Sequence, residues 1–409
     1  MNRFLRTAPT RRLLAVILGA VVAIAAGTTI AIAAQGSGPV PPAKPLARAI
    51  HQALAAPALS GASGQISFTN GLISGADIQG SDPLLTGGSG RFWVSPGHGL
   101  RLEVQGDNGD VNAVIRNGSF WAYDPSSNTV YEGTLPTGGA AKDKTAAKDK
   151  TARGADAVPS ISQIQADLSR AMTHLTLSPA IPGDVAGRPT YTLSVSPRQS
   201  GGLLGAAQLA WDAVRGVPLR FALYARGESS PVLSLEATHI SFGHVPTAVF
   251  NIKPPAGATV VNLGSPGSSG TSKTDTAGKH QAPVTGVSSV AAKLPFALAA
   301  PAQLDGMARQ SVRLLHMGKS PAALLTYGQG LGGIIVIEQV AAPGTLKLGT
   351  TPSGEKPGLS LPTVTINGAS GQELDTALGT VIRFSSGGVA YTVLGSVTPQ
   401  VARAGARGL

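Results

Sequence analysis

The sequence predicts an α+β protein built mainly on an antiparallel sheet with one apolar face. Apolar and polar residues alternate in short runs between residues 61 and 257, for example at 65–69 and 100–105, and this period of two is typical of half-buried strands. Turn residues separate the runs, and Asn117-Gly118 between two of them is a strong hairpin signal. The 53 Gly and 30 Pro residues favour turns and strands over long helices.

Two short helices are expected to accompany the strands of this sheet. The first covers residues 46–59, where apolar residues recur at helical spacing. The second covers residues 161–175, whose apolar residues again share one side, and Ser160 is a candidate N-cap. The sheet can bury its apolar face against these helices or against a ligand.

Composition divides the chain into segments. We expect a signal peptide or membrane anchor at 1–34, a linker at 35–45, a main domain at 46–262, a second linker at 263–282 and a small C-terminal α+β domain at 283–409. Within the main domain, residues 138–156 carry a direct repeat with alternating charges and no apolar stripe, which predicts a flexible solvated insertion. In the last domain we expect buried strands at 333–338 and 363–368, a hairpin over 379–394 and a helix at 302–315.

The N-terminal segment has the features of an export signal. Arginines at positions 3, 6, 11 and 12 precede an uncharged run from residue 13 to residue 34. As a helix this run would be about 33 Å long, which is enough to span a bilayer. Residues 31–34 also offer a small-residue cleavage site, so an uncleaved anchor and a cleaved signal peptide both remain open. Either alternative places the rest of the chain outside the cytoplasm, anchored to the cytoplasmic membrane or secreted.

Several kinds of chemistry are disfavoured by the residues present. The chain has no cysteine, which excludes disulfides and thiolate metal sites. Its net charge is +11, but Lys and Arg are scattered and aromatic residues are only 4%, so no nucleic-acid partner is expected. His239 and His244 are the nearest histidine pair and have no carboxylate beside them, and no nucleophile elbow precedes a helix. We therefore expect no metal, no cofactor and no enzyme activity.

Three stretches of the main domain carry a family resemblance. They are residues 89–103, which include Arg91-Phe92-Trp93, residues 117–131, and residues 209–220 followed by 250–258. As a set these stretches resemble the LolA/LolB-like superfamily of bacterial extracytoplasmic lipoprotein and lipid carriers, in its actinobacterial form. The resemblance implies a half-open, strongly curved antiparallel sheet wrapped on short helices, with a cavity that holds acyl chains. The chain departs from the lipid-anchored members because it has no N-terminal Cys, and no lipid-handling residue of the family can be matched to it.

The large apolar residues of the predicted strands are the candidates for the wall of such a cavity, and each of them also suits an ordinary core position. The ligand-binding candidates are Phe68, Trp93, Leu102, Trp121, Tyr123, Leu193 and Phe221, and Tyr191 and Trp211 belong to the same group of large side chains. A dry apolar pocket would bind an acyl chain with about 0.8 kcal/mol for each buried methylene.

Two functions fit these observations. The first is a non-catalytic carrier or scaffold that binds a lipid or an acylated protein outside the cytoplasm. The second is a regulatory sensor that binds a membrane protein partner of the envelope, as an anti-sigma-factor regulator of the same superfamily does. A wall-associated structural protein is a third hypothesis, and it depends only on the positive charge.

Overall fold

The structure is a computed structural model that describes residues 38–73, 83–106, 109–135, 158–198, 201–262, 284–317, 320–341 and 361–409. The predicted N-terminal segment, the whole 138–156 insertion and the 263–282 linker lie outside these residues. Among the described residues, no helix is long and apolar enough to cross a membrane.

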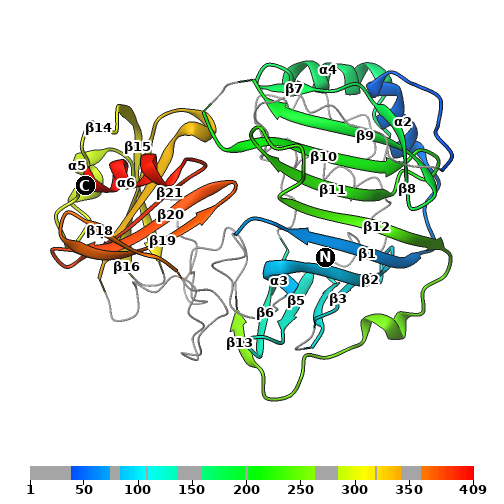
Figure 1. Ribbon diagram of the computed structural model, residues 1–409, viewed down its shortest axis with the longest axis horizontal. Helices are drawn as coiled ribbons and strands as arrows, with labels where there is room; N and C mark the ends of the chain where they lie inside the picture. The colour runs from blue at the N-terminus through cyan, green and yellow to red at the C-terminus, as the bar shows by residue number, and fades with distance from the viewer. Residues whose placement is uncertain are drawn as a thin grey trace, which may run out of the picture.

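Thirteen strands form the larger of two sheets (Figure 1). They are β1 (Ala62–Asn70), β2 (Gly87–Ser95), β3 (Gly99–Val104), β4 (Val111–Arg116), β5 (Ser119–Asp124), β6 (Thr129–Thr134), β7 (Leu175–Leu177), β8 (Ile181–Val185), β9 (Arg188–Pro197), β10 (Leu204–Asp212), β11 (Pro218–Ala225), β12 (Leu233–Phe242) and β13 (Thr259–Asn262). Their order is β13-β6-β5-β4-β3-β2-β1-β12-β11-β10-β9-β7, and β8 also pairs with β9. All pairs are antiparallel except β13 with β6, so the predicted meander is confirmed.

The helices α2 (Leu46–Ala55) and α4 (Ile161–Ala171) lie beside the β7–β11 half of this sheet (Figure 1). The predicted N-cap of α4 is confirmed, because Ser160 Oγ accepts the Gln163 N–H at 3.3 Å and the Gln163 side chain accepts the Ser160 N–H. α2 ends earlier than residue 59, since Pro57 disfavours helical backbone in the residue before it. α4 also ends early, and Leu175 begins β7 instead.

Eight strands form the second sheet, which has its own helices. They are β14 (Gln303–Leu304), β15 (Met307–Met317), β16 (Ser320–Tyr327), β17 (Ile334–Val340), β18 (Thr363–Ile366), β19 (Ala369–Thr376), β20 (Gly379–Ser386) and β21 (Val389–Gly395). The helices α5 (Val287–Ala291) and α6 (Pro399–Arg407) and the 3₁₀ turn η3 (Gly330–Gly332) complete this part. The predicted α+β fold class, with a curved half-barrel sheet on short helices and a smaller α+β part, is thus confirmed.

The predicted helix at 302–315 is wrong, because these residues form β14 and β15. Asp305 and Gly306 have φ values of 47° and 75°, which is the backbone of a two-residue hairpin turn. Asp-Gly is the sequence typical of this turn, and Val312 alternates with exposed Arg313 after it. The hairpin therefore overrides the helical spacing of the apolar residues.

The two sheets are joined by a small set of contacts. Leu203 N–H donates to Ser396 O at 2.9 Å, and Ala377 N–H donates to Leu72 O at 2.8 Å. From the second part, Leu331, Ala377 and Leu378 pack against the core beneath α2 and α4.

The second sheet buries a carboxyl group, that of Glu338 on β17. Its side chain is 0% exposed, Oε2 accepts the Ala299 N–H at 2.9 Å, and Oε1 has no partner among the described residues. Burial raises the pKa of Glu338 from 4.5 to about 7. The folded protein therefore holds a proton that the unfolded chain has already released between these pH values.

We expect this carboxyl to make stability fall as pH rises. The pKa of Glu338 is higher in the folded than in the unfolded protein. The free energy of unfolding is therefore highest below about pH 4.5, falls as the pH rises to about 7, and is constant above that. Replacing Glu338→Gln should remove this fall, which amounts to up to about 3 kcal/mol between pH 4 and pH 8. Urea unfolding at both pH values measures it, with exposed Glu228→Gln as the control. Identical pH dependence in wild type and Glu338→Gln would contradict the assignment.

Candidate binding surfaces of the larger sheet

The strand register assigns each side chain of the larger sheet to one of two faces, because directly paired residues point to the same side. One row runs through Leu193, Leu209, Phe221, Leu235 and Phe68. Leu193 and Leu209 belong to the core that contains α2 and α4, so this side is the helix face. We call the opposite side the outer face.

The β9–β11 part of the helix face is a closed core. Leu193 is 2% exposed and Trp211 is 1% exposed, and both pack with Ile50 of α2 and Ile164 of α4. The Tyr191 and Trp211 rings lie 6.2 Å apart, tilted by 44°. Of the predicted cavity residues, Leu193 is therefore a core residue, and the half-buried Phe221 packs against the same core.

The β1–β6 part of the helix face is apolar but incompletely covered. Half-buried side chains line it: Phe68, Phe92, Leu100, Leu102, Ile115 and Phe120, which we call the open apolar face. Phe68 and Leu102 are two of four partly buried side chains that pack around a small core of Ile66, Val104 and Val111. Of the described helices, only the short α3 (Pro83–Thr86) makes substantial contact here, against β1 and β2.

Glycines shape the floor of the open apolar face. Gly64 of β1 is paired with Phe92, and a Cβ at position 64 would lie 2.8 Å from Phe92 Cε1. The phenyl ring thus lies across the bare backbone of β1. Gly88 and Gly90 in β2 likewise place no side chain beside Phe68 and Ile66 on this face. Neighbouring groups occupy these positions, because a Cβ at Gly88 would lie 3.9 Å from Pro83 Cβ of α3 and a Cβ at Gly90 would lie 2.0 Å from the Glu103 carbonyl oxygen.

The remaining three predicted cavity residues lie on the outer face, away from the helices. The register row here is Trp93, Arg101, Val114 and Trp121, and Tyr123 lies on the same side of β5. The structure thus brings together Phe68 and Leu102 in the open apolar face, with Phe221 farther along the same side. It separates Trp93, Trp121 and Tyr123 from them.

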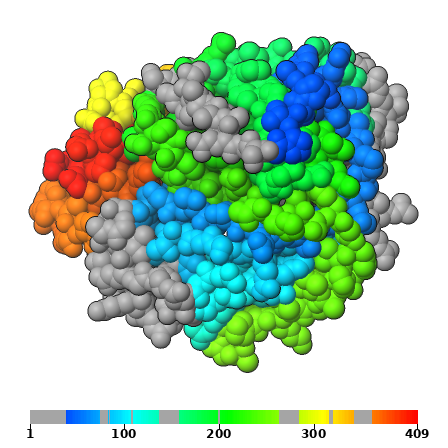
Figure 2. Space-filling view, turned by 45° about the vertical axis from the view of Figure 1, so that its right-hand side comes forward, coloured from blue at the N-terminus to red at the C-terminus, as the bar shows by residue number. Residues whose placement is uncertain are grey.

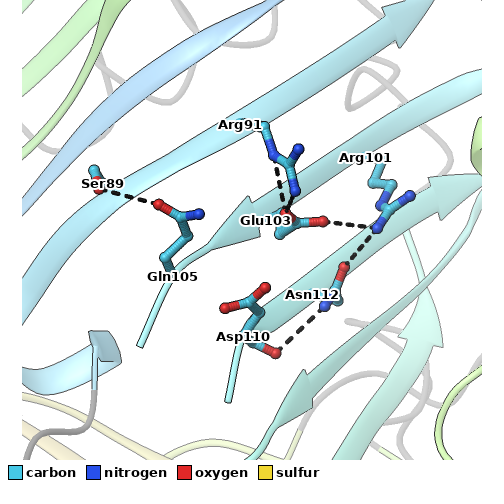
Figure 3. Close-up of polar contacts among 7 residues, drawn as sticks. All are labelled: Ser89, Arg91, Arg101, Glu103, Gln105, Asp110 and Asn112. Carbon is cyan, nitrogen blue, oxygen red and sulfur yellow. Dashed lines mark hydrogen bonds and ion pairs between the residues drawn. The ribbon is translucent and has the colours of Figure 1, made fainter. Parts of the chain in front are cut away.

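Trp93 belongs to a cluster of charged residues. The guanidinium groups of Arg91 and Arg101 lie 5.5 and 4.8 Å from its ring centroid. Both arginines also hold the carboxylate of Glu103, which is 4% exposed, and Arg101 Nη2 donates to Glu103 Oε2 at 2.8 Å (Figure 3). Arg101 donates further to Asn112 Oδ1 at 3.2 Å. Glu103 is hence fully engaged, and this cluster fastens β2, β3 and β4 to one another.

A strap of extended chain crosses the outer face. The strap, residues 250–258, begins at the last residue of η2 (Thr247–Phe250) and leads around the lower edge of the sheet to β13 (Figures 1 and 2). Phe250 is 2% exposed and lies over the bare backbone of Gly99 on β3. Arg116 donates to Asn251 Oδ1, and the Asn128 amide donates to Gly257 O at 3.4 Å, so both ends of the strap are held.

A cavity of about 830 Å³ lies between the strap and strands β4–β6. Its apolar wall comes from Val114, Trp121, Phe250 and Ile252. Gly133 and Phe120, whose side chain the register places on the helix face, also border it. Its polar wall comes from Arg116, Asn117, Ser119, Glu132, Thr134, Asn251, Lys253 and Asn262. Of the predicted ligand residues, Trp121 is the one that lines this cavity. The strap residues were not among the predicted ligand residues, although the Lys253-Pro254-Pro255 run indicates an extended segment.

Among the described residues, no group of three or more His, Asp or Glu side chains is placed to hold a metal ion. His239 contacts Ser241 Oγ at 3.4 Å. The described geometry therefore offers two surfaces for binding, the open apolar face and the cavity beneath the strap.

The described part of the chain is thus a curved sheet that helices cover on one half, joined to a second sheet. An apolar surface on the other half remains incompletely covered. No protein-family model matches the chain, and no curated protein matches it. Solved structures do match: MucB in complex with MucA(peri), at a TM-score of 0.38 and 16% identity over 88% of this chain and 94% of that chain. The MucA/MucB complex of Pseudomonas aeruginosa matches at 0.38 and 15% identity, over 88% and 94% of the two chains.

A LolA superfamily protein from Nitrosomonas europaea also matches, at a TM-score of 0.21 and 10% identity, over 51% of this chain and 99% of that chain. These similarities are too distant to assign a function or a residue role to this chain. Its architecture, a curved antiparallel sheet on short helices, is nevertheless the one that the LolA-like resemblance predicts.

Proposed function

We propose that this protein is a non-catalytic binding protein of the bacterial cell envelope, and that the open apolar face holds the hydrocarbon part of a lipid or an acylated protein. One observation carries the proposal. Six large apolar side chains share one side of β1–β5 and remain half-buried, while α2 and α4 cover only the other half of the sheet. An apolar surface of this kind is a candidate ligand site.

The free energy expected from burying an acyl chain on this face suits a carrier. Eight methylenes placed on this face would contribute about 6 kcal/mol before the entropic cost of association is subtracted. Binding would therefore be moderate and reversible, which a carrier or scaffold requires.

The proposed location follows from the N-terminal segment. An apolar run from residue 13 to residue 34 after four arginines would place the described sheets outside the cytoplasm, near the membrane that supplies lipids. Whether the run is retained as an anchor or removed as a signal peptide, the open apolar face would lie on the same side of the membrane.

A charge on the open apolar face should abolish ligand binding. Leu102→Asp places a carboxylate where the acyl chain would lie, and burying an unpaired charge costs more than the chain gains. We expect at least about a tenfold loss of bound lipid, which corresponds to about 1.4 kcal/mol. The measurement is mass spectrometry of lipid extracted from the purified full chain. Ile115→Asp on the same face should reproduce the loss.

The matched control is Gln105→Asp, which adds the same charge at an exposed position directly after the end of β3. Detergent and background lipid are identical for all variants, so the difference between them reports the site. Thermal unfolding establishes that each variant is folded. Equal lipid content in folded Leu102→Asp and Gln105→Asp would exclude the open apolar face as the lipid site.

A second candidate function is a regulator that binds a membrane protein partner. The second sheet supports it, because this part has its own core around Leu325, Ile334 and Val393 and contributes no residue to the small hydrophobic cluster at the open apolar face. A chain with two such parts can bind a partner on one and a ligand on the other. Affinity isolation from membranes distinguishes the candidates: a stoichiometric protein partner without extractable lipid favours the regulator.

A further inference from the structure

We propose that the cavity beneath the strap binds an acidic saccharide, that is, a sugar bearing a carboxylate or phosphate group. This site lies on the outer face and is separate from the open apolar face, so it does not depend on the function proposed above. Three features of the described residues support it. They are an aromatic ring that contacts no other ring and no cation, two cations without carboxylate partners, and a wall rich in amide and hydroxyl groups.

The aromatic ring is that of Trp121. Among the described residues, Trp93 contacts two guanidinium groups and Trp211 packs against Tyr191, whereas Trp121 makes no ring or cation contact. Its side chain is half-buried and lines the cavity together with Val114 and Ile252. An aromatic surface of this kind can cover the C–H face of a sugar ring and exclude water from it.

The cations are Arg116 and Lys253. Both side chains are exposed, and neither forms an ion pair with a carboxylate in the described part of the chain. Arg116 donates to the neutral amide oxygen of Asn251, which fixes its position but leaves its charge uncompensated. Guanidinium and ammonium groups at the edge of a cavity favour a ligand with a carboxylate or phosphate.

The remaining wall supplies partners for hydroxyl groups. The amide of Asn117 offers a donor and an acceptor, the NH2 group of Asn251 offers donors, and the carboxylate of Glu132 offers acceptors. Glu132 lies beside Asn262, whose amide donates to it at 3.3 Å. This mixture disfavours an acyl chain, because a hydrocarbon would desolvate these groups without satisfying them.

The size and rigidity of the cavity beneath the strap also suit a small ligand. A volume of about 830 Å³ falls within the usual range for small-ligand sites, roughly 300–1,000 Å³. The floor belongs to regular strands, and Val114 is 2% exposed, so the aromatic side of the site is preformed. The cationic side depends on the strap, which Arg116 and Asn128 hold at its two ends.

The test is a titration of the full chain followed through the indole N–H signals in two-dimensional NMR. The chain has three tryptophans, so three indole signals report on the cavity, on the arginine cluster and on the closed core. The probes are D-glucuronate, glucose 6-phosphate, glucose, acetate and inorganic phosphate. We expect the two acidic sugars to shift the Trp121 signal, identified with Trp121→Phe, while the Trp211 signal stays fixed. The response to each acidic sugar shows whether a carboxylate or a phosphate is preferred.

The variant Lys253→Glu reverses one cation on an exposed position without removing a contact. It should weaken binding of both acidic sugars at least about tenfold and leave the response to glucose unchanged. Arg226→Glu, an exposed basic residue outside the cavity, is the matched control and should have no effect. Each variant is compared with wild type by thermal unfolding.

Three outcomes would overturn the proposal. Glucose binding as tightly as glucuronate would remove the role of the cations. Acetate or phosphate binding as tightly as the matching acidic sugar would remove the role of Trp121. A Trp121 signal that none of the probes shifts would mean that the cavity takes no saccharide.

Discussion

Replacing Trp211→Ala should lower the free energy of unfolding by about 3–5 kcal/mol, as large-to-small changes of buried aromatic residues do. Trp211 is 1% exposed and joins Tyr191 of β9 to the core beneath α2 and α4. Its removal opens a void that rigid strands on both sides cannot close. Urea unfolding, followed by far-ultraviolet circular dichroism, measures the change.

The variant Trp211→Phe separates the effect of losing the packed ring from the effect of losing the indole N–H group. The indole nitrogen of Trp211 is buried and has no partner among the described residues, so phenylalanine removes an unsatisfied donor while keeping much of the ring. We therefore expect Trp211→Phe to cost markedly less than Trp211→Ala. Equal losses for the two variants would mean that Trp211 does not pack as the structure has it.

Removing Arg403 should destabilise the second sheet by about 3–5 kcal/mol, because it leaves a buried carboxylate without a counter-charge. Glu373 of β19 is 3% exposed, and it accepts Arg403 Nε at 2.6 Å and Nη2 at 2.5 Å from α6. This bidentate pair fastens the C-terminal helix to the sheet. The variant is Arg403→Met, which keeps the aliphatic stem, and its unfolding in urea gives the loss.

The double variant Arg403→Met/Glu373→Leu is the control for this prediction. It removes both charges, so it should lose less stability than Arg403→Met alone. A double variant that is as unstable as the single one would show that the loss does not come from leaving the buried Glu373 carboxylate unpaired.

Local sequence pattern predicted the strands of the larger sheet well. The positive φ values of Asn117 and Gly118, 52° and 77°, are those that a tight hairpin requires, and this dipeptide was the strongest turn signal in the chain. The helix N-cap at Ser160 could also be predicted from the sequence, since Gln163 follows three residues later. Both features are decided within a few residues, so no tertiary information was needed.

The faces of the strands could not be predicted in the same way. In β2 and β5, large side chains occur on both sides of the strand, as with Phe92 beside Trp93 and Phe120 beside Trp121. A period of two then has no unique phase. A bulge at Gln65 and Ile66 shifts the register between β1 and β12 as well. Trp93, Trp121 and Tyr123 were for this reason grouped with residues of the opposite face.

The strap and its cavity depend on contacts between distant segments. Arg116 and Asn251 are 135 positions apart, and no short-range pattern relates them. The parallel pairing of β13 with β6 has the same origin, because the chain must first cross the outer face from Phe250 to Thr259. Such features follow from the folded sheet as a whole.

Photochemical labelling tests most directly whether the open apolar face receives a hydrocarbon chain. A fatty acid with a diazirine near its methyl end is incubated with the full chain, irradiated, and the labelled residues are identified by mass spectrometry. We expect labels at Phe68, Leu102, Ile115 and their neighbours on the helix face of β1–β5, and we expect these labels to be lost in Leu102→Asp. Labels confined to the outer face or the second sheet, or no saturable labelling at all, would contradict it.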